Sequence, residues 1–267
     1  MILTSHGIIA SSILQVDPDW LAYYNRVIAA GGSLTTTEQN ATKTLVADLK
    51  SAGIWSAMKA IYPMVGASAA ACAQNLKSSS FTGTFTSGWT FASTGVTPNG
   101  TSAYMDTGLK LSTTVSTNNY HLSFYSRTQD TTKSGNDMGA SVTGGNNGLT
   151  FYYLAISVKF FATGAYPTYY VTSLNNDTTG FLIGNRQSST SAKLIQDNTT
   201  LTTLTISDSS LSANNMYLGA SNANGTSQEF QNRQCAFASI GDGLTDTQAS
   251  NFYTAVQAFQ TTLARQV

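Results

Sequence analysis

Few side chains in this sequence of 267 residues could carry out catalysis. His6 and His121 are its only histidines, so a serine–histidine triad would need one of them. The Gly-x-Ser-x-Gly turn that presents the nucleophile in one large class of hydrolases does not occur. His121 lies in the strand-like run 120–127, where a packed or surface histidine is far more common than a catalytic one. We therefore expect no nucleophilic catalysis.

Acid–base chemistry on sugars needs two carboxylates held close together, one of them the acid. The sequence has only two glutamates: Glu38, which reads as part of a helix cap, and Glu229, next to Phe230. Asp106 lies in a strand-like run but has no acidic residue two positions before or after it. The sequence therefore predicts that the protein is not an enzyme. A carboxylate pair assembled from separate strands is the alternative that it leaves open.

Metal and phosphate sites also lack their usual residues. Two cysteines and two histidines without a close pair do not make a zinc site. The glycine-rich run 139–148 has no Lys-Ser/Thr and no helix pattern after it, so we interpret it as a hairpin loop and not as a phosphate-binding loop. Cys72 and Cys235 sit among small and apolar neighbours, which predicts two free, buried thiols. No cofactor is expected from these patterns.

Residues suited to sugar binding occur in two stretches of the chain. Aromatic faces together with amide and hydroxyl groups commonly hold sugars. The glycan-binding candidates are Tyr166, Tyr169, Tyr170, Asn185 and Arg186. The alternatives are that the tyrosines pack in the core and at its rim, and that 185–191 is a hairpin tip without a ligand.

The composition excludes two classes of partner. Hydrophobic residues make up 41% of the chain and charged residues only 10%, and the net charge is zero. Without a basic stripe to neutralise phosphates, nucleic-acid binding is not expected. No apolar run approaches the ~20 residues of a membrane span. A near-neutral chain also lacks the charge repulsion that keeps monomers apart, so we expect a homo-oligomer.

Helical patterns come first along the chain. Residues 1–16 read as an N-terminal arm, and 17–74 as a helical segment. Asp17 followed by Pro18 is a helix start, and Thr35 with Glu38 forms a capping box for a second helix. Residues 54–60 are expected to add one or two helical turns before Pro63 stops them.

Strand patterns follow, in residues 75–267. Asn-Gly pairs at 99–100, 147–148 and 224–225 favour tight turns between strands. In the run 120–127, Leu122 and Phe124 face one side while His121 and Ser123 face the other. About ten such strands predict an all-β jelly-roll sandwich. A capping box at Thr245 and an apolar stripe after it predict a C-terminal helix that docks on the sandwich.

Several strings resemble a known fold family. They resemble the strands and the final helix start of laminin G-like, concanavalin A-like jelly rolls, and they occupy 99–104, 121–127, 181–186, 216–220 and 237–246. With the preceding runs 44–50 and 54–63, the chain more specifically resembles structural proteins of tailed bacteriophages. The resemblance covers 17–267 and implies a virion component.

Calcium enters only through this resemblance, because laminin G-like domains often hold one ion at the sandwich rim. The oxygen ligands available to it here would be Asn176, Asp177 and Asp242. No Asp-x-Asp cluster supports them, so the expected metal content is none, with calcium left as the alternative.

The resemblance and the missing catalytic motifs together predict a non-enzymatic bacteriophage virion structural protein, displayed on the capsid or tail and in contact with other virion proteins. The first residues lack the positive charge that opens a signal peptide, which favours assembly in the host cytoplasm and release by lysis. The alternative is a carbohydrate-binding adhesin or receptor-binding protein that recognises a host or mucosal glycan.

Overall fold

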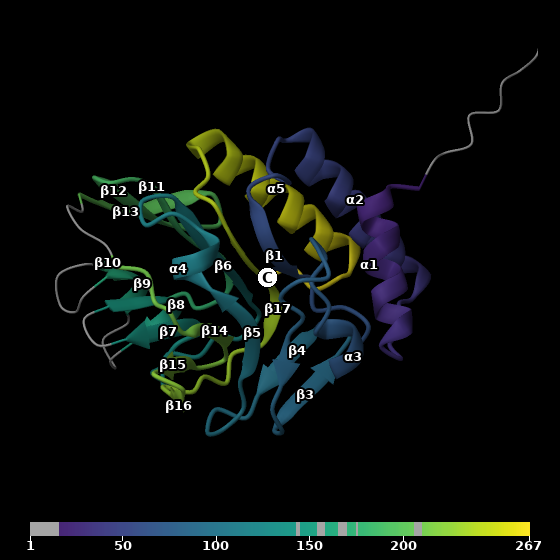
Figure 1. The fold of residues 1–267 in the computed structure, drawn as a ribbon, viewed down its shortest axis with the longest axis horizontal. Coiled ribbons are helices and arrows are strands. Elements are labelled where there is room, and N and C mark those ends of the chain that lie inside the picture. Colours follow the sequence, from purple (N-terminus) through teal and green to yellow (C-terminus); the bar gives the residue numbers. More distant parts are fainter. Residues whose placement is uncertain (1–15, 143–144, 154–157, 165–169, 175, 206–209) are drawn as a thin grey trace, which may run out of the picture.

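A computed structural model describes residues 16–142, 145–153, 158–164, 170–174, 176–205 and 210–267 as three layers (Figure 1). Two β-sheets pack face to face, and helices cover the outer face of the first sheet. The predicted class, an all-β sandwich with helices before it and one after it, is confirmed. Among the described residues, no helix has the length and apolar character needed to cross a membrane.

Sheet 1 is the helix-covered sheet. Its strands, in spatial order, are β13 (Thr199–Leu204), β12 (Ser191–Gln196), β11 (Gly180–Ser188), β6 (Tyr120–Ser126), β17 (Cys235–Gly241), β4 (Gly95–Pro98) and β3 (Trp89–Ala92), and β1 (Met58–Tyr62) also pairs with β17. The strand pairs of this sheet are antiparallel. Some of them are hairpins, and others join strands from distant parts of the chain.

Sheet 2 forms the other face of the sandwich. Its strands, in spatial order, are β10 (Tyr170–Leu174), β9 (Val158–Gly164), β8 (Gly145–Tyr153), β7 (Met138–Val142), β14 (Asn215–Leu218), β5 (Met105–Lys110) and β2 (Thr84–Phe85), with β15 (Ser221–Ala223) on β7 and β16 (Thr226–Gln228) on β15. The apolar run 149–161 enters both β8 and β9.

The three long helices begin where the sequence predicts. The Asp17 carboxylate accepts from the backbone N–H of Asp19 and begins α1 (Pro18–Ala29). Capping boxes at Thr35 and Thr245 begin α2 (Thr36–Ser51) and α5 (Asp246–Thr262). Each cap satisfies N–H groups that have no partner inside the helix. Two short helices, α3 (Ala69–Cys72) and α4 (Leu111–Thr114), lie in connections.

Two apolar cores hold the layers together, one between helices and sheet 1 and one between the sheets. Strand β6 contributes to both, because successive side chains point to opposite faces. Leu122 and Phe124 enter the core between the sheets, whereas Tyr125 enters the core under the helices. Both faces of β6 are therefore buried, and the residues that share each face are those that the alternation within 120–127 predicts. Cys72 and Cys235 are free and buried, as expected.

The prediction of helical turns at 54–60 is wrong. Residues 58–62 form β1, which pairs antiparallel with β17, so that Ile61 lies opposite Ser239. Ile61 packs in the core under the helices and Tyr62 in the core between the sheets, so both faces of the strand are buried. A partner about 180 residues away decides this conformation, and short-range patterns cannot detect it. The sandwich therefore includes a strand from within the segment 17–74.

Candidate functional site

The residue types of a serine–histidine pair do meet, at the end of β6 and β17 that α5 covers. His121 Nε2 lies 3.0 Å from Ser239 Oγ, and His121 Nδ1 lies 2.6 Å from the Asp242 carbonyl oxygen. Because that carbonyl can only accept, Nδ1 carries the proton and Nε2 accepts from the Ser239 hydroxyl. Ser123 Oγ, 2.7 Å from Ser239 Oγ, extends the hydrogen-bonded chain.

This cluster is packed inside the protein. His121, Ser123 and Ser239 have no exposed surface, and Phe252 of α5 lies edge-on to the imidazole, with ring centroids 5.8 Å apart. Burial lowers the pKa of His121 to about 4, a larger effect than the opposing one of its hydrogen bond to Asp242. The imidazole is neutral at pH 7 and has no exposed surface, so of the two expected environments, packed or surface, the structure shows the packed one.

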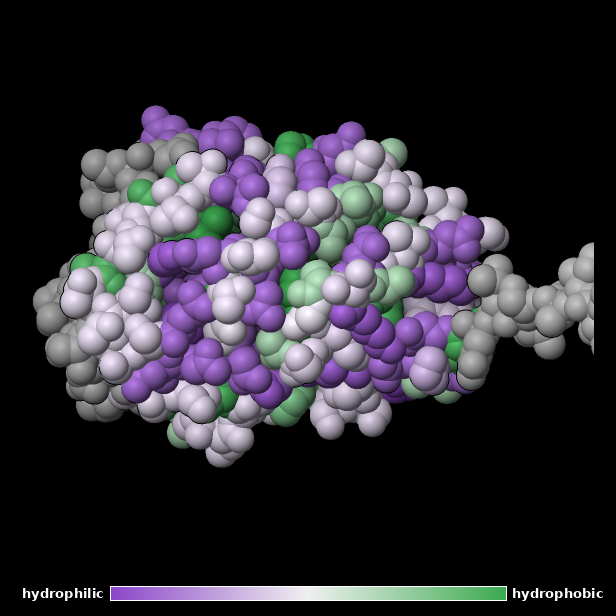
Figure 2. Space-filling view, turned by 90° about the horizontal axis from the view of Figure 1, so that it is seen from above, coloured by the Kyte–Doolittle hydropathy of each residue, from purple (hydrophilic) through white to green (hydrophobic). Residues whose placement is uncertain are grey.

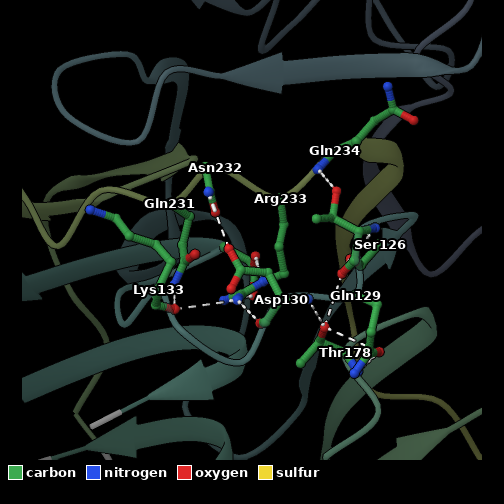
Figure 3. A network of polar contacts seen from close by, with 11 residues as sticks. Ser126, Gln129, Asp130, Lys133, Thr178, Gln231, Asn232, Arg233 and Gln234 are labelled. Atoms are coloured by element: carbon green, nitrogen blue, oxygen red, sulfur yellow. Dashed lines mark hydrogen bonds and ion pairs between the residues drawn. The ribbon is translucent and has the colours of Figure 1, made fainter. Parts of the chain in front are cut away.

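Loops at the opposite end of the same strands form a rim (Figure 3). The strand register places Ser126 beside Gly180 at this end, and His121 beside Asn185 at the end covered by α5. We use the word rim for the segments 127–137, 176–179, 196–199 and 229–234. These segments connect strands of both sheets, and hydrogen bonds join them to one another.

A buried ion pair fixes the shape of the rim. Arg233 Nε lies 2.9 Å from Asp137 Oδ1 and Arg233 Nη2 lies 3.2 Å from Asp137 Oδ2, with neither side chain exposed. Arg233 Nη1 also donates to the carbonyl oxygens of Asp130 and Lys133, at 3.4 and 3.5 Å. A guanidinium group that grips a carboxylate through two parallel bonds is strongly directional. Arg233 therefore ties the loop 127–137 to the residues before β17.

A second set of bonds joins this loop to the segment before β11 (Figure 3). Thr178 N donates to Gln129 Oε1 at 2.9 Å, and Asp130 N donates to Thr178 Oγ1 at 2.8 Å. Burial by itself raises the pKa of Asp130, but hydrogen bonds from Thr132 and Asn232 outweigh it, and the pKa lies below its usual value. Asp130 is therefore charged at neutral pH and serves the rim as an acceptor.

An open cavity of about 220 Å³ lies beside the β12–β13 turn at this rim. Its lining residues are Asp177, Gln196, Asp197, Thr199 and Leu201. Asp197 and Asn198 have φ angles of 46° and 66°, the left-handed conformation that a two-residue hairpin turn of this kind requires. Gly180, also at positive φ, lies so close that a Cβ there would collide with the Asp197 carboxylate. The turn thus holds one carboxylate at a fixed place on the cavity wall.

Gln196, one of the lining residues, carries a buried acceptor without a partner. The residue is 4% exposed, and its Nε2 donates to the Thr179 carbonyl oxygen at 2.8 Å. That bond fixes which way the amide faces, and Gln196 Oε1 has no hydrogen-bond partner. Leaving a buried acceptor unpaired costs about 1–3 kcal/mol.

The two carboxylates of the cavity are oriented by nearby backbone. Asp197 Oδ1 accepts from Phe181 N at 2.8 Å. Asp177 Oδ1 accepts from the N–H and the hydroxyl of Thr179, at 2.9 and 2.7 Å. The side-chain polar groups of the lining are therefore two carboxylates, the Gln196 amide and the Thr199 hydroxyl. This set suits a ligand that donates hydrogen bonds.

The structure overturns the expectation that Asn185 and Arg186 bind glycan. Asn185 is 1% exposed, and its side chain exchanges two hydrogen bonds with the backbone of Leu244, at 2.7 and 2.9 Å. Arg186 is fully buried and donates to Asn118 Oδ1 at 3.0 Å. Asn185 meets the segment that leads into α5, whereas Arg186, the next residue of β11, points to the opposite face, and both side chains are structural.

The remaining predicted site residues do not form one site. Tyr166 and Tyr169 lie outside the described residues, and Tyr170 is the first residue of β10. Asn176 and Asp177 belong to the rim, whereas Asp242 lies at the α5-covered end, where it pairs with Lys59 at 2.8 Å. The three oxygen donors proposed for calcium therefore cannot serve one ion. Across the described part of the chain, no group of three His, Cys, Asp or Glu residues could hold a metal.

Sequence reasoning missed Gln196, Asp197 and Thr199. The available signal was Asp197-Asn198 between two strand-like runs, a turn that carries a carboxylate at its first position. That signal identifies a turn, but it does not show that Asp177 lies on the same cavity. Only the pairing of β11 with β12 brings these residues together.

Comparisons with known proteins show the fold. No family model and no curated protein matches the sequence. The receptor-binding domain of botulinum neurotoxin D shares 8% identity over 75% of this chain and 53% of its own, with a TM-score of 0.46. A Trypanosoma rangeli sialidase shares 10% identity over 80% of this chain and 38% of its own, with a TM-score of 0.43. Domain 4 of AbnA shares 13% identity over 73% of this chain and 98% of its own, with a TM-score of 0.53. AbnA is an extracellular arabinanase from Geobacillus stearothermophilus, and the domain was solved in complex with arabinotriose. The chain therefore has a β-sandwich fold similar to that of the arabinanase domain.

Proposed function

We propose that the chain is a non-catalytic carbohydrate-binding module whose rim cavity holds a sugar. The observation that carries this proposal is the polar lining of the cavity: the carboxylates of Asp177 and Asp197, the amide of Gln196 and the hydroxyl of Thr199. Sugar hydroxyls are donors as well as acceptors, and carboxylate and amide oxygens are strong partners for them. Specific polar groups in a cavity of this kind orient a small ligand.

The fold is consistent with this function. The arabinanase domain that resembles this chain was solved with arabinotriose, so a sandwich of similar build binds a short sugar chain. The buried serine–histidine cluster supports the non-catalytic part of the proposal, because His121 and Ser239 have no exposed surface. Hydrogen bonds hold the carboxylates of the rim in place: Asp177 and Asp197 at the cavity, and Asp137 in the ion pair with Arg233.

The test is a calorimetric titration of the full chain with a panel of neutral oligosaccharides, including arabinotriose. We expect at least one member to bind, and Gln196→Met to weaken that binding about tenfold through loss of one buried hydrogen bond. The matched control is Asp246→Asn, an exposed carboxylate at the opposite end of the sandwich, paired with Lys193. Absence of binding across a broad glycan array, or equal losses in both variants, would contradict the proposal.

We also propose that the module acts on a virus particle, in contact with other virion proteins. The observation that favours this role is the surface of α1. Among the described residues, the exposed large hydrophobic side chains are Val16, Leu21, Ile28 and Val267, and the first three lie in or beside α1. Figure 2 shows hydrophilic residues over most of the face that it presents, so apolar exposure is not a general property of this surface.

Mass spectrometry of purified particles tests this role. We expect the chain among the particle proteins, and we expect a chain without residues 1–16 and with Leu21→Ser and Ile28→Ser to be lost from them. Absence of the intact chain from particles would leave a free carbohydrate-binding module. Full incorporation of the altered chain would remove α1 from the contact surface.

A further inference from the structure

We infer that two copies of the chain pair through the exposed face of α1, antiparallel and with Asn25 on the two-fold axis. This inference rests on the proposed virion role, because it names the partner that α1 meets there: a second copy of this chain. Figure 1 shows α1 at the outer edge of the helical layer, where another molecule can reach it. Its exposed face lies opposite Trp20, Tyr23 and Val27, which pack in the core under the helices.

Five exposed residues form this face, and none of them is charged. They are Leu21, Ala22, Asn25, Ile28 and Ala29. Asn25 is three or four positions from each of the others, so all five lie on one side of the helix. Leu21 is 42% exposed and Ile28 is 47% exposed, and they are two of the four large hydrophobic side chains that the described residues leave exposed. Apolar side chains gathered on one helix face indicate a contact surface.

The charged groups of α1 are bonded to other parts of the protein. The charged residues of the helix are Asp19 and Arg26. Asp19 forms an ion pair with Lys50 at 2.6 Å, and Arg26 Nη2 donates to the Asn75 carbonyl oxygen at 2.7 Å. A partner with a charged surface would bury its charges against a neutral face without compensation, which is unfavourable. A second copy brings the same neutral face, and the net charge of the chain is zero, so no like charges oppose the approach.

The order of large and small side chains makes this face complementary to itself. The two large side chains are Leu21, four positions before Asn25, and Ile28, three positions after it. The two alanines occupy the mirrored positions, with Ala29 four positions after Asn25 and Ala22 three positions before it. In an antiparallel pair centred on Asn25, Leu21 therefore meets Ala29 of the partner subunit, and Ile28 meets Ala22 of the partner subunit. Each large side chain then fills the space beside a small one, as close helix packing requires.

The centre of the pair supports the same arrangement. Asn25 of each copy would face its counterpart, and one amide can donate to another and accept from it. A polar Asn in an otherwise apolar helix seam fixes the register, because a shift would place it against an apolar side chain. A parallel pair would set the large side chains against one another and the alanines against one another, which packs poorly. The antiparallel pair is therefore the one that the face favours.

The helix face alone is small for a stable dimer. The 12 residues of α1 span about 18 Å, and we expect their face to bury less than about 1,200 Å², the lower end of the range for specific interfaces. Residues 1–15, which precede the helix, include six Ile and Leu residues and no Asp, Glu, Lys or Arg. In an antiparallel pair they start beside the C-terminal end of the partner's α1, where they can add apolar contact. We therefore expect a dissociation constant of about 1–100 μM for the full chain, and one at least about tenfold higher without residues 1–15.

Sedimentation velocity of the full chain between about 1 and 200 μM tests the association. We expect a monomer–dimer equilibrium. Leu21→Ser together with Ile28→Ser is expected to weaken it at least about tenfold, because apolar contact is lost in both copies. The matched control is Val267→Ser, which removes an exposed apolar side chain outside α1 and is expected to leave the equilibrium unchanged.

Cysteine cross-linking tests the geometry of the pair. The native Cys72 and Cys235 are buried, so an added surface thiol is the group that forms a disulfide on mild oxidation. We expect Asn25→Cys to give a covalent dimer, because the two copies of this position meet. Leu21→Cys is not expected to do so, since its two copies lie about 12 Å apart along the helices and a disulfide needs Cα atoms within about 7 Å. Asn251→Cys, at an exposed position of α5, is the matched control for random collision.

The outcomes separate this inference from the proposed function. A monomer over the whole concentration range would overturn the inference, and so would a dimer that the two serine substitutions do not weaken. Cross-linking of Leu21→Cys or Asn251→Cys to the same extent as Asn25→Cys would also overturn it. If the inference fails but the chain altered in α1 is still lost from particles, another virion protein covers α1 and the proposed role stands. If the altered chain is incorporated in full as well, the inference and the virion role of α1 fail together.

Discussion

The two ends of strands β6 and β11 contrast in how they satisfy their polar groups. At the end covered by α5, both ring nitrogens of His121 and both side-chain amide groups of Asn185 have partners. At the rim, Gln196 Oε1, Gln231 Oε1 and Asn232 Oδ1 have none. These are three of the six buried side-chain atoms without a partner among the described residues, and the only amide oxygens in that group.

The contrast shows that residue type is a poor guide to a site in this fold. The covered end holds the serine–histidine pair that chemistry would single out, yet that pair is closed and fully bonded. The rim holds ordinary amides and aspartates, yet it combines a cavity with unsatisfied acceptors. Native interiors rarely leave such groups unpaired, so their concentration distinguishes the rim from the end that holds His121.

The largest effect is expected from breaking the ion pair that shapes the rim. Arg233→Met leaves the Asp137 carboxylate buried without its guanidinium, and removing one partner of such a pair costs about 3–5 kcal/mol of unfolding free energy. Urea denaturation measures this loss. The double variant Arg233→Met, Asp137→Leu removes both charges and is expected to recover much of it. Equal stability of Arg233→Met and the native chain would show that the pair does not hold the rim.

At the covered end, acid is expected to destabilise the protein through His121. Its pKa is about 4 in the folded state and near 6.5 when unfolded, so between these values the unfolded chain binds the proton and the folded one does not. Stability is complete above about pH 6.5 and falls as the pH drops toward 4, by about 3 kcal/mol at most. His121→Gln should flatten this slope. Denaturation midpoints measured between about pH 4 and 6.5 test this prediction. An unchanged pH dependence of stability in the variant would show that groups other than His121 cause it.

Asn185 gives a smaller effect at the same end. Asn185→Ala removes two hydrogen bonds to the Leu244 backbone and leaves a buried N–H and a buried C=O without partners, which costs about 2 kcal/mol. Thermal unfolding should show a clear drop in Tm. Because α5 begins two residues after Leu244, hydrogen exchange should increase first in that helix. No loss of stability would mean that water replaces both bonds.

Local patterns predicted much of this fold. The helix starts at Asp17, Thr35 and Thr245 depend on side chains within three residues of the cap, so the sequence alone identifies them. The alternation in 120–127 predicted which residues of β6 share a face. Strand β1 was missed because its conformation depends on β17, whose pairing no nearby residue signals.

The candidate site could not be predicted in the same way. Asp177 and Asp197 are 20 positions apart in the sequence. They line the same cavity because β11 pairs antiparallel with β12. Asn185 and Arg186 have the residue types of a sugar site, but both are buried, Asn185 against the backbone of Leu244 and Arg186 on the opposite face of β11. Burial and hydrogen-bond satisfaction are tertiary properties, and they decide which polar residues can meet a ligand.

The variant Gln196→Met is expected to have the smallest effect on stability. Its effect is to be compared with that of Asn185→Ala at the other end of the strands. This variant removes the unpaired Oε1 and keeps the volume, while losing one bond to the Thr179 carbonyl oxygen. The gain and the loss oppose each other, so unfolding free energy should change by less than about 1 kcal/mol. Denaturation and sugar titration on the same sample measure both quantities. If Gln196→Met destabilised the protein as much as Asn185→Ala and left sugar affinity unchanged, the two ends would be equivalent structural regions. We expect the opposite, because an acceptor without a partner contributes little to folding, whereas the amide of Gln196 lines the cavity.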